Sequence, residues 1–145
     1  MLFDIDKRPS NKLAAIDDKC GLLTYGELVD ICTKISKVLP SRELVFCLCE
    51  NRVESLAGFL ALYDNKDVCL LLSSSIDKDL LHTLHATYSP AYYWMPKTIN
   101  DNNEVIFTFN EYVLVKTKNS SPSMHKELSM LMTTSGTTGS PKLVR

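Results

Sequence analysis

The last stretch of the chain concentrates residue types that bind anions. Residues 128–132 are mostly apolar, and hydroxyl side chains, two glycines and a lysine follow them. Gly136 and Gly139 permit positive φ angles and a close approach of the backbone to a ligand, and consecutive backbone N–H groups in such a loop form a concave anion site. Lys142 adds a positive charge. Five further side chains can donate hydroxyl hydrogen bonds, namely Thr134, Ser135, Thr137, Thr138 and Ser140. The pattern predicts a polyphosphate site, with ATP as the expected ligand.

This stretch differs from the common nucleotide P-loop, Gly-x-x-x-x-Gly-Lys-Ser/Thr, because Gly139 follows Gly136 too soon and Pro141 precedes Lys142. It resembles the phosphate-loop signature of the adenylate-forming superfamily, which contains acyl- and aryl-CoA ligases, adenylation domains of nonribosomal peptide synthetases, and luciferases. Nine consecutive positions, residues 134–142, fit that signature. Thr133 and Leu143 depart from its usual residues. The competing interpretation is a Ser/Thr-rich surface turn, but such turns seldom carry this order of Gly, Pro and Lys.

The resemblance implies a role for each matched position. Lys142 would hold the loop or contact a phosphate, and Mg²⁺ would share the neutralisation of charge. The residues that would embrace the triphosphate are Thr134, Ser135, Gly136, Thr137, Thr138 and Gly139. The substrate would be a carboxylic acid, activated as an acyl-AMP and passed to the thiol of coenzyme A or of a carrier protein's phosphopantetheine.

The resemblance also implies that the catalytic residues lie beyond Arg145, because the adenine-binding aromatic segment, the ribose-binding acid and the catalytic lysine of that superfamily have no match in this sequence. We therefore expect the N-terminal fragment of an AMP-binding domain, inactive when alone. The alternative is a self-sufficient nucleotide-binding or assembly module without catalysis. The gene sequence after Arg145 would separate these hypotheses. The particular acid, and coenzyme A against a carrier protein, stay open.

The first elements of the chain are short. Residues 1–12 read as an irregular lead-in, residues 13–16 as a strand, and residues 17–19 as a turn. Thr24 and Glu27 form a capping-box pattern. The helix that follows should end at Pro40, and its apolar residues recur with helical spacing at 28, 31, 32, 35, 38 and 39.

The middle of the chain alternates strands and helices. Strands are predicted at residues 43–49, 68–72 and 91–94. The helix between the first two should be capped by Asn51 with Glu54 three positions on, and its buried face should hold Val53, Leu56, Ala57, Leu60 and Tyr63. Asp77 should cap a second helix over residues 78–87. This order predicts right-handed crossovers and a parallel βαβαβ sheet with flanking helices.

The remaining segments lead to the motif. Residues 96–103 form a polar connection, and residues 105–109 and 112–116 form a β-hairpin around Asn110 and Glu111. Residues 118–124 read as a flexible link, and residues 128–132 as a strand. The fold class is therefore α/β: a parallel βαβαβ sheet plus a hairpin, matching an N-terminal portion of the adenylate-forming enzyme fold. We divide it into a βα core (13–95), a hairpin and linker (96–127), and a strand with the phosphate loop (128–145).

Composition restricts the remaining classes. The chain has 145 residues, 45% of them hydrophobic, and a net charge of -1, which gives no electrostatic reason to expect nucleic acid or an anionic membrane as partner. No apolar run approaches the roughly 20 residues of a membrane span, and the early acids of the N-terminus do not fit a signal peptide. Five cysteines without zinc or haem spacing are interpreted as reduced core thiols of a cytoplasmic protein.

Several other residues are interpreted as structural. His82 and His85 share a predicted helix face, but no further ligands are evident, so we assign no metal site. Cys47 and Cys49 share a strand face and are expected to be buried. Tyr92, Tyr93 and Trp94 are interpreted as core and rim residues rather than as an adenine platform, and no chemical role is assigned to His125.

Without ATP, the loop 134–142 should be mobile. We also expect self-association through apolar surface that the downstream half of the superfamily normally covers.

Overall fold

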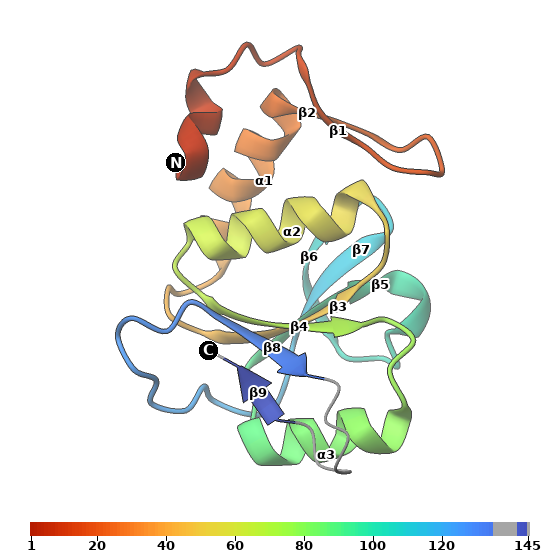
Figure 1. Ribbon diagram of the computed structural model, residues 1–145, viewed down its shortest axis with the longest axis vertical. Coiled ribbons are helices and arrows are strands. Elements are labelled where there is room, and N and C mark those ends of the chain that lie inside the picture. The colour runs from red at the N-terminus through yellow and green to blue at the C-terminus, as the bar shows by residue number, and fades with distance from the viewer. Residues whose placement is uncertain (135–141, 145) are drawn as a thin grey trace.

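The computed structural model describes residues 1–134 and 142–144 (Figure 1). The helices are η1 (Leu2–Lys7) and η2 (Lys97–Ile99), which are 3₁₀, and α1 (Tyr25–Val38), α2 (Val53–Asp64) and α3 (Lys78–Tyr88). The strands are β1 (Leu13–Ile16), β2 (Leu22–Thr24), β3 (Leu44–Cys49), β4 (Val68–Ser73), β5 (Tyr92–Pro96), β6 (Glu104–Phe109), β7 (Tyr112–Lys116), β8 (Met130–Thr134) and β9 (Lys142–Val144).

The main sheet has the strand order β6-β7-β5-β3-β4-β8-β9. Its centre is parallel: β3 pairs with β4 and β5, and β4 pairs with β8. Both flanks are antiparallel, through the β5–β7, β6–β7 and β8–β9 pairs. Val45 lies opposite Cys69 on one side and Tyr92 on the other, which confirms the predicted parallel arrangement of the first strands.

The helices cover opposite faces of this sheet, with α2 on one side and α3 on the other (Figure 1). Chain order explains the split. The α2 crossover moves from β3 to its neighbour β4, whereas the α3 crossover returns past β3 to β5, and two right-handed crossovers in opposite directions must use opposite faces. The fold class predicted from the sequence is therefore confirmed.

Alternate residues of β3 pack into two separate hydrophobic cores, one on each face of the sheet. Val45 and Cys47 pack with α1 and α2, whereas Phe46 and Leu48 pack on the α3 side. Because β3 is buried on both faces, its sequence is continuously apolar rather than alternating. The continuous apolar sequence is the reason that a buried strand could be predicted here from the sequence.

The start of α1 confirms the predicted capping box. The Thr24 hydroxyl accepts a hydrogen bond from the Glu27 backbone N–H at 3.2 Å, and a Glu27 carboxylate oxygen accepts one from the Thr24 N–H at 2.8 Å. Asp77 likewise caps α3, as predicted, by accepting from the N–H groups of Asp79 and Leu80. Both caps are local in sequence, which is why they were predictable.

The predicted cap of α2 is wrong. The N-cap is Arg52, without a side-chain cap bond, and the Val53 N–H instead donates to a carboxylate oxygen of Asp17 at 3.1 Å. The predicted buried face is also partly wrong, since Leu56 is 42% exposed. The helix instead buries Ala57, Gly58, Ala61 and Leu62, and Gly58 lies so close to the fully buried Trp94 that a Cβ there would overlap the indole.

The N-terminal region is more regular than predicted. Residues 1–12, expected to be irregular, contain η1, and Leu22–Thr24 forms the unpredicted strand β2, which pairs with β1 in a separate two-stranded sheet. Figure 1 shows this hairpin extending away from the main sheet. A strand of three residues carries too little alternation for sequence recognition.

The second hairpin agrees with its prediction. In the β6–β7 pair, Phe109 lies opposite Tyr112, and Asn110 adopts φ 47° in the turn between them. Asn tolerates this left-handed conformation better than most residues.

Within the described residues, no helix combines the length and apolarity needed to cross a membrane.

Candidate functional site

The structure brings the two ends of the predicted phosphate loop together. Thr134 ends β8, Lys142 begins β9, and the two residues lie opposite each other in the antiparallel pair. The predicted site residues Ser135, Gly136, Thr137, Thr138 and Gly139 lie outside the described residues, as does most of the loop predicted to be mobile. Their contacts to phosphate therefore stay a prediction.

The loop departs from the carboxyl edge of the parallel strands. Since β3, β4, β5 and β8 run in the same direction, Cys49, Ser73 and Thr134 end their strands at one edge of the sheet. After β3 the chain turns to the α2 face, and after β4 it turns to the α3 face (Figure 1). Ligands in open α/β sheets bind at such a switch point, outside the carboxyl ends of the strands.

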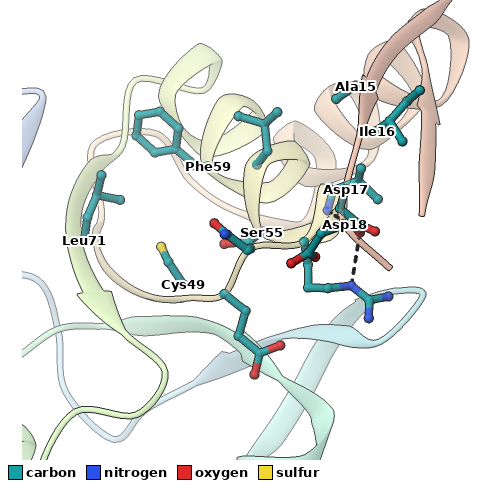
Figure 2. Close-up of a pocket in the computed structure, with 13 residues that line it drawn as sticks. Ala15, Ile16, Asp17, Asp18, Cys49, Ser55, Phe59 and Leu71 are labelled. Atoms are coloured by element: carbon teal, nitrogen blue, oxygen red, sulfur yellow. Dashed lines mark hydrogen bonds and ion pairs between the residues drawn. The ribbon is translucent and has the colours of Figure 1, made fainter. Parts of the chain in front are cut away.

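Two adjoining cavities open at this edge, with volumes of about 490 Å³ and about 630 Å³. Both are lined by Asp18, Cys49, Glu50, Asn51, Arg52 and Leu71. Figure 2 shows the first cavity, with Phe59 and Leu71 on one side and Ile16, Asp17 and Asp18 on the other. These cavities were not predicted from the sequence, because their walls come from β1 and the turn after it, from α2, and from the ends of β3 and β4.

An ion cluster forms one wall of the first cavity. Arg52 Nε lies 3.1 Å from Asp17 Oδ2 and 3.4 Å from Glu54 Oε2, and both carboxylates are almost fully buried. Burial raises the pKa of Asp17, but N–H donation from Gly21, Val53 and Lys19, together with the Arg52 charge, holds that pKa below its usual value. The cluster fastens the β1–β2 turn to the start of α2.

The rest of the carboxyl edge is polar and exposed. Ser74 Oγ donates to Glu50 Oε1 at 3.2 Å, and the Ser73 and Ser75 hydroxyls lie 2.8 Å apart. Burial raises the pKa of the Cys49 thiol, which therefore stays protonated and is a poor nucleophile near neutral pH. These side chains can hold a small organic molecule, with apolar contacts to Phe59 and Leu71, but they do not form a nucleophile–base pair.

The histidines have structural contacts. The His85 ring lies 2.9 Å from the Tyr93 hydroxyl through Nδ1 and 3.0 Å from the Asn119 amide through Nε2, so both nitrogens are engaged. Burial, together with His82, lowers the pKa of His85. No trio of His, Cys, Asp or Glu residues within the described chain is arranged to hold a metal ion.

The aromatic and sulfur residues mostly belong to the core. Tyr92, Tyr93 and Trp94 are buried, which confirms their structural interpretation. All five cysteines are free, but Cys20 is exposed, so its assignment as a core thiol is wrong: it lies in the β1–β2 turn with φ 61°. Apolar side chains near the carboxyl edge are exposed at Ile16 (63%), Leu22 (58%), Met132 (49%) and Leu56 (42%), and self-association through such surface stays a prediction.

Comparison with solved structures places this fold. The N-terminal subdomain of Klebsiella oxytoca NpsA matches 97% of this chain with a TM-score of 0.64 and 20% identity. O-succinylbenzoate coenzyme A synthetase (MenE) from Bacillus subtilis, in complex with AMP, matches 97% with a TM-score of 0.63 and 20% identity. E. coli MenE with bound OSB-AMS matches 92% with a TM-score of 0.60 and 17% identity. No family model and no curated protein matches the sequence.

These matches establish the fold: the chain has the architecture of the N-terminal subdomain of adenylate-forming enzymes. The match spans only 39% of the NpsA chain, 40% of the B. subtilis MenE chain and 30% of the E. coli MenE chain. At these identities the likeness concerns architecture, and activity has to be argued from the residues of this chain.

Proposed function

We propose that this chain is the N-terminal part of an ATP-dependent carboxylate-activating ligase of the adenylate-forming superfamily. The observation that carries the proposal is the match of residues 134–142 to the superfamily's phosphate-loop signature, joined to the position of Thr134 and Lys142 at the carboxyl edge of the corresponding fold. Ligands of open α/β sheets bind at this switch-point edge, which favours a phosphate loop over a Ser/Thr-rich surface turn.

The proposed reaction joins a carboxylate oxygen to the α-phosphorus of ATP, breaks the bond between the α- and β-phosphates, and releases pyrophosphate. Both reactants are anions, so the protein must position them and offset the charge that develops on the phosphates. Lys142 would supply a positive charge. The N–H and hydroxyl donors would come from Thr134, Ser135, Gly136, Thr137, Thr138 and Gly139. The acyl group would then pass to the thiol of coenzyme A or of a carrier-protein phosphopantetheine.

Mg²⁺ fits this scheme as an ion that accompanies the nucleotide. The part of the chain that the structure describes offers no cluster of carboxylates or imidazoles that could hold a metal by itself. Mg²⁺ in nucleotide sites usually keeps several waters and is bound through substrate phosphates and one or two carboxylates. Bound in this way, the ion would neutralise phosphate charge.

The solved relatives support the substrate class. One MenE structure contains AMP, and NpsA structures contain anthranilyl-AMSN and 3-hydroxybenzoyl-AMSN. We accordingly propose a carboxylic acid as the substrate.

We also propose a cytoplasmic location, which the free cysteines support. The division at residues 13–95, 96–127 and 128–145 is a proposal about segments, since strands from all three belong to one sheet.

The test is carboxylate-dependent exchange of pyrophosphate into ATP. The protein that the gene encodes is assayed across a panel of aliphatic, aromatic and amino acids, beside the 145-residue chain alone. We expect exchange with the encoded protein and none with the 145 residues. Lys142→Ala should lower kcat/KM for ATP by about 100-fold, whereas Lys116→Ala, an exposed residue at the end of β7, should have no effect.

Two results would oppose the proposal. One is an encoded protein that binds ATP but exchanges no pyrophosphate with any acid, which would favour a nucleotide-binding or assembly module. The other is equal activity of Lys142→Ala and Lys116→Ala, which would remove the phosphate loop from the mechanism.

A further inference from the structure

The connection between β7 and β8 lacks regular secondary structure, yet it is fastened to the body of the protein. Thr117 Oγ1 donates to the Pro90 carbonyl at 2.7 Å, and Asn119 contacts His85. The Ser121 hydroxyl accepts the Leu44 N–H at 2.7 Å and donates to a Glu43 carboxylate oxygen. The segment predicted as a flexible link is therefore held against the amino ends of the central strands.

Arg42 fastens the last part of this connection. Its Nη1 donates to the Leu128 carbonyl at 2.7 Å and its Nη2 to the His125 carbonyl at 2.8 Å. These carbonyls belong to one turn, which the Leu128 N–H closes by donating to the His125 carbonyl at 2.9 Å. The guanidinium group is rigid and planar, so two such bonds fix the turn in position and orientation.

Contacts within the sheet also position β8, which pairs with β9 on one side through Met132, Thr133 and Thr134 and with β4 on the other. Its parallel pairing with β4 comprises Cys69 opposite Met130, Leu70 opposite Leu131, and Leu71 opposite Met132. Leu131 is buried and Met132 is half exposed, so the burial of one face of β8 also favours a single register. A slip of one residue would exchange the two faces of β8 and displace Thr134, the first residue of the motif.

We propose that Arg42 is a positioning residue that sets the register of β8 from the opposite end of the sheet. The guanidinium group holds the turn at residues 125–128, the turn starts β8 at Met130, and β8 delivers its last residue to the carboxyl edge. The consequence for nucleotide binding rests on the function proposed above, whereas the consequence for β8 itself does not.

The backbone of Arg42 allows a clean test. Its φ of 71° is left-handed, a conformation that glycine adopts without strain. Arg42→Gly therefore removes the guanidinium group while suiting the backbone, and the variant should fold. We expect amide hydrogen exchange at Leu131 and Met132 to accelerate at least tenfold, with exchange at Phe46 and Leu48 of β3 unchanged, because the loss is confined to β8.

Three further measurements sharpen the test. Millimolar methylguanidinium should restore slow exchange in Arg42→Gly. Arg42→Lys should show an intermediate exchange rate, because an ammonium group cannot form the two parallel hydrogen bonds of a guanidinium. Arg8→Ala, which removes an exposed arginine of the N-terminal region, should exchange at the rate of the unmodified chain. ATP affinity, measured by titration in the encoded protein, should fall about tenfold in Arg42→Gly and recover with methylguanidinium.

Unchanged exchange at Leu131 and Met132 in Arg42→Gly would overturn the positioning role. So would faster exchange spread evenly over β3 and β8, because it would show general destabilisation instead. Faster exchange confined to β8 supports the positioning role whatever the nucleotide result, and failure of the unmodified encoded protein to bind ATP would count against the proposed function alone.

Discussion

Polar side chains at the two ends of the parallel sheet differ in their exposure and in their hydrogen bonding. At the amino end, Asp67 is 1% exposed and accepts hydrogen bonds from the Glu43 N–H at 2.9 Å and the Asn65 amide at 3.0 Å. At the carboxyl end, Asp18, Glu50 and Asn51 are exposed and line cavities. The amino-end groups bond one another, whereas these three carboxyl-end groups are open to solvent, although Glu50 also accepts from Ser74 and the neighbouring Asp17 is buried against Arg52.

This contrast separates a structural edge from a binding edge. Buried polar groups cost stability unless they are hydrogen-bonded, so the amino end must use its donors and acceptors internally. At the carboxyl end, water solvates the side chains, and a ligand can replace that water at little cost.

The largest effect is expected in the shared core, at Gly58. A Cβ at this position would overlap the indole of the fully buried Trp94. Gly58→Ala should therefore destabilise both edges together, by about 3 kcal/mol, which corresponds to a decrease in Tm of roughly 10 °C.

Thermal unfolding followed by circular dichroism checks this value. The double variant Gly58→Ala, Trp94→Leu serves as the control, since a smaller side chain removes the overlap and the two costs should be less than additive. An unchanged Tm in Gly58→Ala would contradict the contact.

The second effect is a pH dependence that belongs to the amino edge. Burial raises the pKa of Asp67 to about 6, although the Asn65 and Glu43 N–H donors oppose the shift. The folded state binds this proton more tightly than the unfolded state, so the contribution of Asp67 to stability is complete below about pH 4 and is lost as pH rises through about 6. The loss should reach at most about 3 kcal/mol.

Urea unfolding at pH 4.5, 5.5 and 7 measures this change, and Asp67→Asn should flatten it. Asp17 of the carboxyl end provides the contrast: its pKa is lowered, so its contribution is present above its usual pKa and is lost as pH falls through the lowered value. An Asp67→Asn variant that keeps the full pH dependence between 4.5 and 7 would assign the effect to another group.

The smallest effects compare two serines that each contact a glutamate, Ser121 at the amino end and Ser74 at the carboxyl end. Ser121→Ala leaves the Leu44 N–H and the Glu43 carboxylate without this partner and should cost about 1–2 kcal/mol of unfolding free energy. Ser74→Ala removes an exposed bond and should stay within about 0.5 kcal/mol. Equal values from urea unfolding would abolish the distinction between the edges.

Local sequence determined the elements whose causes are local. The capping box at Thr24 and Glu27, the Asp77 cap, and the turn at Asn110 depend on residues a few positions apart, and each was predicted. The apolar runs of β3 and β4 identified buried strands, and the crossover rule then supplied their parallel order. The phosphate-loop pattern was also readable, because its residue types and spacing are contiguous.

Tertiary structure decided what depends on distant residues. Asp17 caps α2 across 36 positions in place of Asn51, Gly58 faces inward because Trp94 arrives from β5, and Arg42 reaches a turn 86 positions away. The carboxyl-edge cavities likewise exist only once β1, β3, β4 and α2 are assembled. Such contacts leave no periodic trace in the sequence, because each partner alone looks like an ordinary polar or small residue.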